Sequence, residues 1–123
     1  MRTEEQLIDF VCHTNFEDIP EAARRTIRNQ FLTVVGTLAA GAAEDGCDEA
    51  VRFYRDLGGR EEATILINGG KIPAHDAAFV NAVMARSLDL CDSIAPGPHI
   101  GAALIYGSLA AAELAGGVSG RDF

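Results

Sequence analysis

The sequence predicts a mainly α protein with one short β-hairpin, and three observations support this fold class. Apolar residues over 27–38 recur at the spacing of one buried helix face. A segment from about residue 76 to 90 is apolar nearly all round, which is typical of a helix buried on most sides. Between them a β-branched run meets Asn68-Gly69-Gly70, a hairpin signal near residues 63–73.

The first half of the chain predicts three helices in succession. Thr3 and Gln6 have capping-box spacing, so the chain is expected to open with a helix of roughly three turns. Pro20 falls at the first turn of a second helix. A third helix carries Tyr54 and stops at Gly58. The first helix carries an apolar stripe of Leu7, Ile8 and Val11, and the second buries a face of Ile27, Phe31, Val34, Val35 and Leu38.

The last part of the chain predicts a helix that follows His99 and is rich in glycine and alanine, so that a neighbouring backbone can approach it closely. In the final "SGRDF", Ser119 and Asp122 are spaced like an N-cap and its N3 acid. Because only one residue follows this predicted helix start, we expect the chain to be a fragment or one half of a split protein. The alternative is that these residues form a frayed C-terminal tail. We expect residues 1–123 to form a single helical domain.

Composition excludes several classes of function. The 123 residues are 48% apolar, which is enough for one small core. The formal charge of -8 argues against nucleic acid or an anionic membrane as the main partner. The most apolar segment, 100–114, is too short to span a bilayer. Cys12, Cys47 and Cys91 form no CxxC pair, so we expect reduced thiols in the cytoplasm and no metal site.

The stretch "SLDLCDSIAPGPHIG" contains the first group of candidate site residues. If the buried helix continues through it, Arg86, Asp89 and Asp92 lie at i, i+3 and i+6 on one face, with Ser93 next. Ionisable groups at the end of an apolar helix are costly unless they pair or have a function. The structural alternative is an Arg86–Asp89 ion pair, with Asp92 and Ser93 satisfying turn amides.

His99 adds a candidate acid–base group. Pro96-Gly97-Pro98 is expected to fix the turn, which places His99 at the start of the last helix, where the helix dipole disfavours a charged ring. A neutral ring that faces a carboxylate can take a proton from carbon or give one to a leaving hydroxyl, and the helix end attracts a substrate carboxylate. The alternative is an N-cap or surface histidine. For Cys91 we expect a buried inert thiol, since no Cys–His arrangement is visible.

Two long stretches resemble the N-terminal helical region of the MmgE/PrpD family. They are "LGGREEATILINGGKIPAHDAAFVNAVMARSLDLCDS" and "PHIGAALIYGSLAAAELAGGVSGRDF". The family includes 2-methylcitrate dehydratase, cis-aconitate decarboxylase and iminodisuccinate epimerase. The resemblance covers essentially all of this chain and the first part of a longer, two-domain family member.

The family motif Ala-Leu-Asp-Phe-Asp-Asp-Thr, followed by a loop and His-Pro, is similar to "SLDLCDS" and the loop after it. Asp89 and Asp92 match the first and last acids, Ser93 the threonine and His99 the loop histidine. Three positions depart from the motif: Cys91 replaces the middle acid, Ile100 the proline, and Arg86 a histidine found in many members.

The resemblance implies a component of a metal-independent, dehydratase-type lyase for a small polycarboxylate such as 2-methylcitrate. Asp89 and His99 would be catalytic, while Ser93, Arg86 and Asp92 would bind substrate, with no cofactor. A missing C-terminal part or a partner chain would complete the site, and we expect a homo-oligomer or such a complementing chain. Decarboxylation or epimerisation is the alternative within the family. A non-catalytic helical dimerisation module, or an inactive remnant, is the alternative outside catalysis.

Overall fold

The structure is a computed structural model that describes residues 2–93 and 97–123. In chain order the elements are α1 (Thr3–His13), the 3₁₀ turn η1 (Phe16–Asp18), α2 (Glu21–Gly41), α3 (Cys47–Leu57), β1 (Ala63–Thr64), β2 (Lys71–Ile72), α4 (Ala74–Arg86) and α5 (Gly101–Leu114). Helices dominate the described residues, and β1 and β2 form an antiparallel hairpin. The predicted mainly α class with one hairpin is confirmed.

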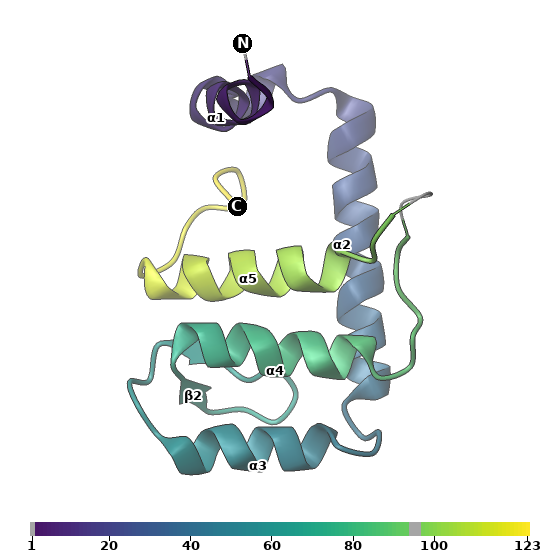
Figure 1. Cartoon of the computed structure of the whole chain (residues 1–123), viewed down its shortest axis with the longest axis vertical. Helices are drawn as coiled ribbons and strands as arrows, with labels where there is room; N and C mark the ends of the chain where they lie inside the picture. Colours follow the sequence, from purple (N-terminus) through teal and green to yellow (C-terminus); the bar gives the residue numbers. More distant parts are fainter. Residues whose placement is uncertain (1, 94–96) are drawn as a thin grey trace.

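The helices form a stack beside one long helix. In Figure 1, α3, α4 and α5 lie one above another, α4 and α5 pack against α2, and α1 lies apart from them at the far end of α2. α4 packs on α5, α2 and α3, and the hairpin packs on α4 and α5. α4 is therefore the central element of the stack.

The core lies where the stack meets the C-terminal half of α2. Its largest fully buried side chains are Tyr106, Leu38, Ile65, Met84, Val34, Val80 and Cys47. The predicted buried face of α2 is confirmed at Val34 and Leu38, whereas Ile27 is 54% exposed. The difference arises because the N-terminal half of α2 extends past the stack (Figure 1).

α1 differs from the prediction at its start. The amide of Arg2 donates a 2.9 Å hydrogen bond to the Glu5 carboxylate, so Arg2 is the N-cap and the expected Thr3–Gln6 capping box is wrong by one residue. No residue of α1 is buried, and its stripe of Leu7, Ile8 and Val11 is 61–68% exposed. The periodicity predicts the helix correctly, but no described element covers its apolar face.

The hairpin is held by α3 and α4. Gly69 and Gly70 have φ of +72° and +77°, which L side chains rarely adopt, so the predicted glycine turn is confirmed. The Arg55 guanidinium of α3 donates to the carbonyls of Asn68 (2.9 Å) and Gly69 (2.6 Å). From α4, the buried Asn81 side chain bonds to the backbone beside β1 through Leu66 N and Thr64 O. The helices thus supply the support that a lone hairpin lacks.

Glu113 of α5 ties the hairpin to the stack and makes stability depend on pH. Its carboxylate accepts hydrogen bonds from the Thr64 amide (3.0 Å) and hydroxyl (2.7 Å), and it pairs with Lys71 Nζ at 2.9 Å. Burial raises the pKa of Glu113, but the bonds from Thr64 and Lys71 outweigh it and hold the pKa below its usual range. Because the pKa of Glu113 is lower in the folded protein than in the unfolded chain, its ionised carboxylate stabilises the fold at any pH above the unfolded pKa. This stabilisation is lost as the pH falls through the folded pKa.

We expect Glu113→Gln to lower the free energy of unfolding by about 1 kcal/mol at neutral pH. The difference from wild type should shrink as pH falls below about 4, where the unfolded carboxyl also binds a proton. Urea unfolding followed by circular dichroism, once at neutral pH and once below about pH 4, measures this difference in the free energy of unfolding. Glu61→Gln, at an exposed position between α3 and β1, is the matched control. An equal loss at both pH values would contradict the ionic role of Glu113.

Candidate active site

The helix that carries Arg86 ends before the acidic residues. The Ser87 hydroxyl lies 2.8 Å from the Met84 carbonyl oxygen and 3.0 Å from that of Gly41, so the end of α4 contacts α2. α4 stops at Arg86, and Asp89 has a left-handed φ of +53°, which a right-handed helix does not contain. The prediction of a helix to residue 90, with Arg86, Asp89 and Asp92 on one face, is wrong.

Arg86 and Asp89 nevertheless pair. Arg86 Nη2 lies 3.2 Å from Asp89 Oδ1, and the Asp89 side chain is 81% exposed. This is the ion pair that the sequence offered as its structural alternative. Because water surrounds the carboxylate, the pair adds little stability and its partners can exchange for other ions.

Asp92 caps α5 from nine residues away. Its carboxylate oxygens accept the Gly101 amide at 3.0 and 3.2 Å. A side chain at Gly101 would overlap the Asp92 carboxylate and the Gln30 amide, so glycine permits this close approach. The sequence predicted that the start of this helix would attract a substrate carboxylate, but in the structure Asp92 supplies the anion there.

We expect Asp92→Ala to destabilise the fold by about 1 kcal/mol, the typical cost of losing a helix cap, and Asp92→Asn to keep most of that stability because it retains an acceptor. Urea unfolding measures the cost, and hydrogen exchange at the Gly101 amide locates it. Asp45→Ala is the control, because Asp45 is exposed between α2 and α3 and its side chain makes no hydrogen bond with any described residue. Unchanged exchange at Gly101 in Asp92→Ala would show that the carboxylate does not cap α5.

His99 lies directly before α5, as predicted, and its ring is fixed by backbone. Nδ1 lies 2.6 Å from the Asp92 carbonyl oxygen. A carbonyl only accepts hydrogen bonds, so Nδ1 carries the hydrogen and Nε2 is the nitrogen free to accept a proton. Among the described residues, the partners of the ring are this carbonyl and the Cys91 thiol, and the expected carboxylate is not one of them.

Cys91 joins these groups, which the sequence did not predict. Its Sγ lies 3.3 Å from His99 Nδ1 and contacts Arg86 Nη1, and the residue is half-buried. The expectation of a buried thiol is wrong, and the Cys–His contact that the sequence did not show is present. Arg86, Asp89, Cys91, Asp92 and His99 thus form one connected cluster between α4 and α5, which we call the corner.

The remaining predicted residues of this loop contribute less. The exposed Ser93 side chain makes no hydrogen bond to any residue within 2–93 or 97–123. Pro96, part of the predicted proline-glycine turn, lies outside the described residues, and Gly97 and Pro98 are exposed. The loop therefore leaves Ser93 free to meet a ligand in solvent.

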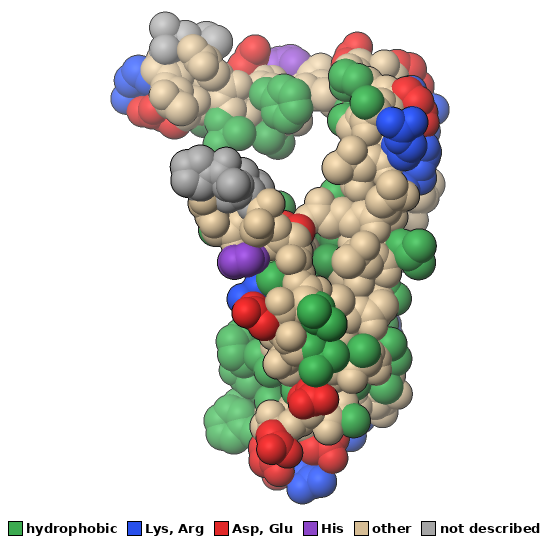
Figure 2. All heavy atoms as spheres, turned by 90° about the vertical axis from the view of Figure 1, so that its right-hand side faces the viewer, with side chains coloured by type: hydrophobic (Ala, Val, Ile, Leu, Met, Phe, Trp, Pro, Cys, Tyr) green, Lys and Arg blue, Asp and Glu red, His purple; other side chains and the backbone are tan. Residues whose placement is uncertain are grey.

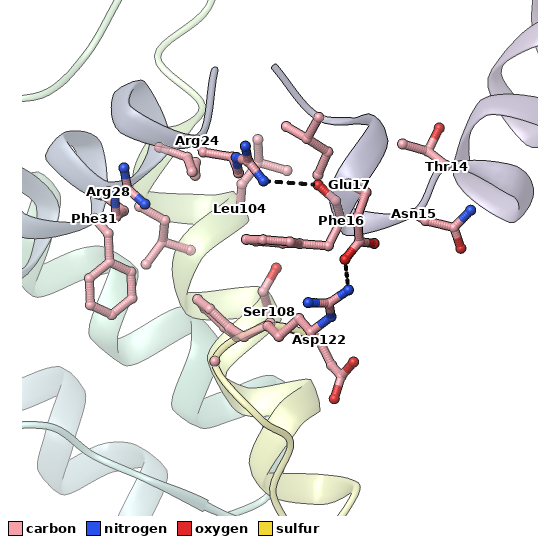
Figure 3. A pocket seen from close by; sticks show the side chains of 16 residues that line it. Thr14, Asn15, Phe16, Glu17, Arg24, Arg28, Phe31, Leu104, Ser108 and Asp122 are labelled. Carbon is pink, nitrogen blue, oxygen red and sulfur yellow. Dashed lines mark hydrogen bonds and ion pairs between the residues drawn. The ribbon is translucent and has the colours of Figure 1, made fainter. Parts of the chain in front are cut away.

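A hollow of about 870 Å³ lies elsewhere, between the α1–α2 arm and the α5–C-terminal segment. Figure 2 shows hydrophobic side chains on the side of α1 that faces the rest of the molecule. Figure 3 shows Phe16 and Glu17 of η1, with the Phe16 ring beneath the Arg24 guanidinium at 4.8 Å. Arg121 from the C-terminal turn pairs with Glu17 and lies 5.1 Å from the same ring. No corner residue lines this hollow.

Neither a metal site nor a membrane span is found in the part of the chain that the structure describes. Its His, Cys, Asp and Glu side chains form no group of three or more that could hold a metal ion. None of its helices combines the length and the apolar character needed to cross a bilayer.

A mainly α scaffold that places histidine, carboxylate and guanidinium groups together at one helix junction is a candidate acid–base enzyme domain. Among protein families, residues 5–123 match the MmgE/PrpD N-terminal domain. The chain therefore belongs to the MmgE/PrpD family, which contains dehydratases and related enzymes. The comparisons with curated proteins and with solved structures gave no match.

Proposed function

We propose that this chain is a component of a metal-independent, dehydratase-type lyase that acts on a small polycarboxylate such as 2-methylcitrate. The observation that carries the proposal is the His99 ring, held at Nδ1 by the Asp92 carbonyl with Nε2 left free. The ring belongs to the same connected corner as the Arg86–Asp89 pair. The family membership supports the class of reaction.

In this proposal Asp89 and His99 divide the proton transfers of a dehydration. One removes a proton from the carbon beside a substrate carboxylate, and the other protonates the leaving hydroxyl. Arg86 can exchange its solvated partner Asp89 for a substrate carboxylate, and the free Ser93 hydroxyl can hold the substrate. We assign Asp92 a positioning role, because it already caps α5 and fixes the His99 ring.

The corner is open to water on the described chain. Asp89, Ser93 and His99 are all exposed. Acid–base catalysis on carbon is favoured when water is excluded from the reacting groups. We therefore propose that a C-terminal part or a partner chain covers the corner and completes the site. Decarboxylation or epimerisation would use the same first proton transfer and is the alternative within the family.

The test is an assay of the chain alone and mixed with the C-terminal portion of a member of the MmgE/PrpD family. We expect no turnover alone and dehydration of 2-methylcitrate with the complement. If the mixture instead releases carbon dioxide from cis-aconitate, the chain is a component of a decarboxylase. If it epimerises iminodisuccinate, the chain is a component of an epimerase. If the mixture turns over none of the three substrates, the proposal fails for this substrate class.

The second candidate is a non-catalytic helical dimerisation module, and the exposed apolar side chains of α1 favour it. Leu7, Ile8, Phe10 and Val11 are all more than 60% exposed, and unpartnered apolar surface of this kind is typical of interaction sites. We expect analytical ultracentrifugation to show an oligomer that Leu7→Glu disrupts. A monomeric wild-type chain would contradict this role.

A further inference from the structure

We propose that Cys91 is a nucleophilic thiol that reacts preferentially with small electrophiles carrying a carboxylate. The inference goes beyond the proposed function, because it requires neither a second chain nor turnover. It rests on three different side chains that meet at one point: the Cys91 thiol, the Arg86 guanidinium and the His99 imidazole.

Two nitrogen atoms from other side chains lie beside the sulfur. Arg86 Nη1 contacts Sγ, and His99 Nδ1 lies 3.3 Å from it. Arg86 donates to the sulfur, since a guanidinium only donates, whereas the one hydrogen on His99 Nδ1 goes to the Asp92 carbonyl. Cysteines that lie beside a guanidinium or an imidazole are among the reactive ones in proteins, so the contact with Arg86 favours Cys91 as a nucleophile.

Two carboxylates also lie in the corner, and neither blocks this arrangement. Asp92 directs both oxygens to the Gly101 amide. Asp89 binds Nη2 of Arg86, not Nη1, and is 81% exposed, so water screens its charge. An incoming carboxylate can take the place of Asp89 on the guanidinium. The carbon attached to it is then brought close to Sγ.

The chain contains two internal references. Cys12 on α1 is exposed and makes no hydrogen bond or ion pair with any described residue, so it reports an ordinary accessible thiol. Cys47 is buried and its thiol donates to the Gly41 carbonyl at 3.3 Å, so it reports an inaccessible one. Cys91 is between them in exposure, so a faster reaction than Cys12 cannot come from access alone.

The chemistry needs no further reactant. With iodoacetate, the sulfur forms a bond to carbon, the carbon–iodine bond breaks, iodide leaves with the electron pair, and the thiol proton passes to water. An α,β-unsaturated carboxylate is a second electrophile of this class. The sulfur bonds to its β carbon, the electron pair of the double bond moves to the α carbon, and that carbon takes a proton.

The experiment measures alkylation rates of each cysteine in the full chain by peptide mass spectrometry, with anionic iodoacetate and neutral iodoacetamide at one pH. We expect the iodoacetate-to-iodoacetamide rate ratio at Cys91 to exceed that at Cys12 by about fivefold, the effect of one exposed ion pair. Arg86→Gln should bring the ratio down to that of Cys12. Arg86→Lys should retain most of it, and Arg60→Gln, which removes an exposed charge elsewhere, should change nothing.

Equal ratios at Cys91 and Cys12 in the wild type would overturn the proposal, as would a ratio unaffected by Arg86→Gln in a protein with wild-type circular dichroism. Should Arg86→Gln fail to fold, Asp89→Asn provides the second test. It frees Arg86 from its carboxylate partner, so the ratio at Cys91 should rise, and an unchanged ratio would contradict the role of Arg86. Because no substrate is present, failure here is distinguishable from failure of the lyase proposal.

Discussion

Replacing His99 by glutamine is expected to lower kcat/KM of the complemented enzyme by about 10²- to 10⁴-fold, the usual contribution of one general acid–base group. The ring is held through Nδ1, at 2.6 Å from the Asp92 carbonyl, and Nε2 is the group that exchanges protons with substrate. Glutamine can still donate to that carbonyl through its amide but cannot carry the proton transfer. The measurement is the initial rate on the substrate that the wild-type mixture turns over.

His75→Gln is the matched control for this substitution, because His75 is an exposed histidine on α4 outside the corner. Its rate should equal that of the wild type. If His99→Gln also retained the wild-type rate while the complex still formed, His99 would have no part in the proton transfers.

Gly41→Ala is expected to lower the free energy of unfolding by about 1–3 kcal/mol, the cost of forcing an extra methyl group into a packed contact. A β carbon at Gly41 would overlap the Ser87 hydroxyl and the Met84 carbonyl oxygen, where α2 meets the end of α4. Separating them would disturb the contact between α2 and the end of α4, where the corner begins. Urea unfolding followed by circular dichroism gives the stability.

Gly36→Ala, on the same helix, is the control with the opposite sign. Nothing lies within 4 Å of a β carbon at Gly36, so the substitution should stabilise the protein by about 0.5–1 kcal/mol through helix propensity alone. If Gly41→Ala stabilised the protein as well, α2 and α4 would not approach each other as closely as described.

The elements of this fold were predictable because their signals are local. Periodic apolar residues, Pro20 and the glycines at 69 and 70 each act within a few positions of the chain, and they predict the helices and the hairpin. The end of α4 was not predictable, because the apolar pattern continues to Leu90 while the residues after Arg86 contact α2 through Ser87 and Gly41, 46 residues earlier in the sequence. The exposure of α1 was not predictable either, since periodicity identifies an apolar face and not what covers it.

The corner was predictable in part for the same reason. The Arg86–Asp89 pair and the place of His99 before α5 follow from short spacings and from the proline-glycine turn signal. The contact between Cys91 and His99 arises because Asp92 caps α5 and closes the loop, which brings residues eight positions apart together. The spacing of Cys91 and His99 alone carries no signal for that closure.

The most direct test of the corner is the tautomer of His99, read from the ¹⁵N chemical shifts of the chain with labelled histidine. At about pH 8.5 an ordinary imidazole is neutral, so each ring shows which nitrogen carries the hydrogen. His99→Gln identifies the resonances by their loss. The structure predicts hydrogen on Nδ1 and a bare Nε2 for His99. Hydrogen on Nε2 would contradict the bond to the Asp92 carbonyl, and with it the acid–base role proposed for this ring.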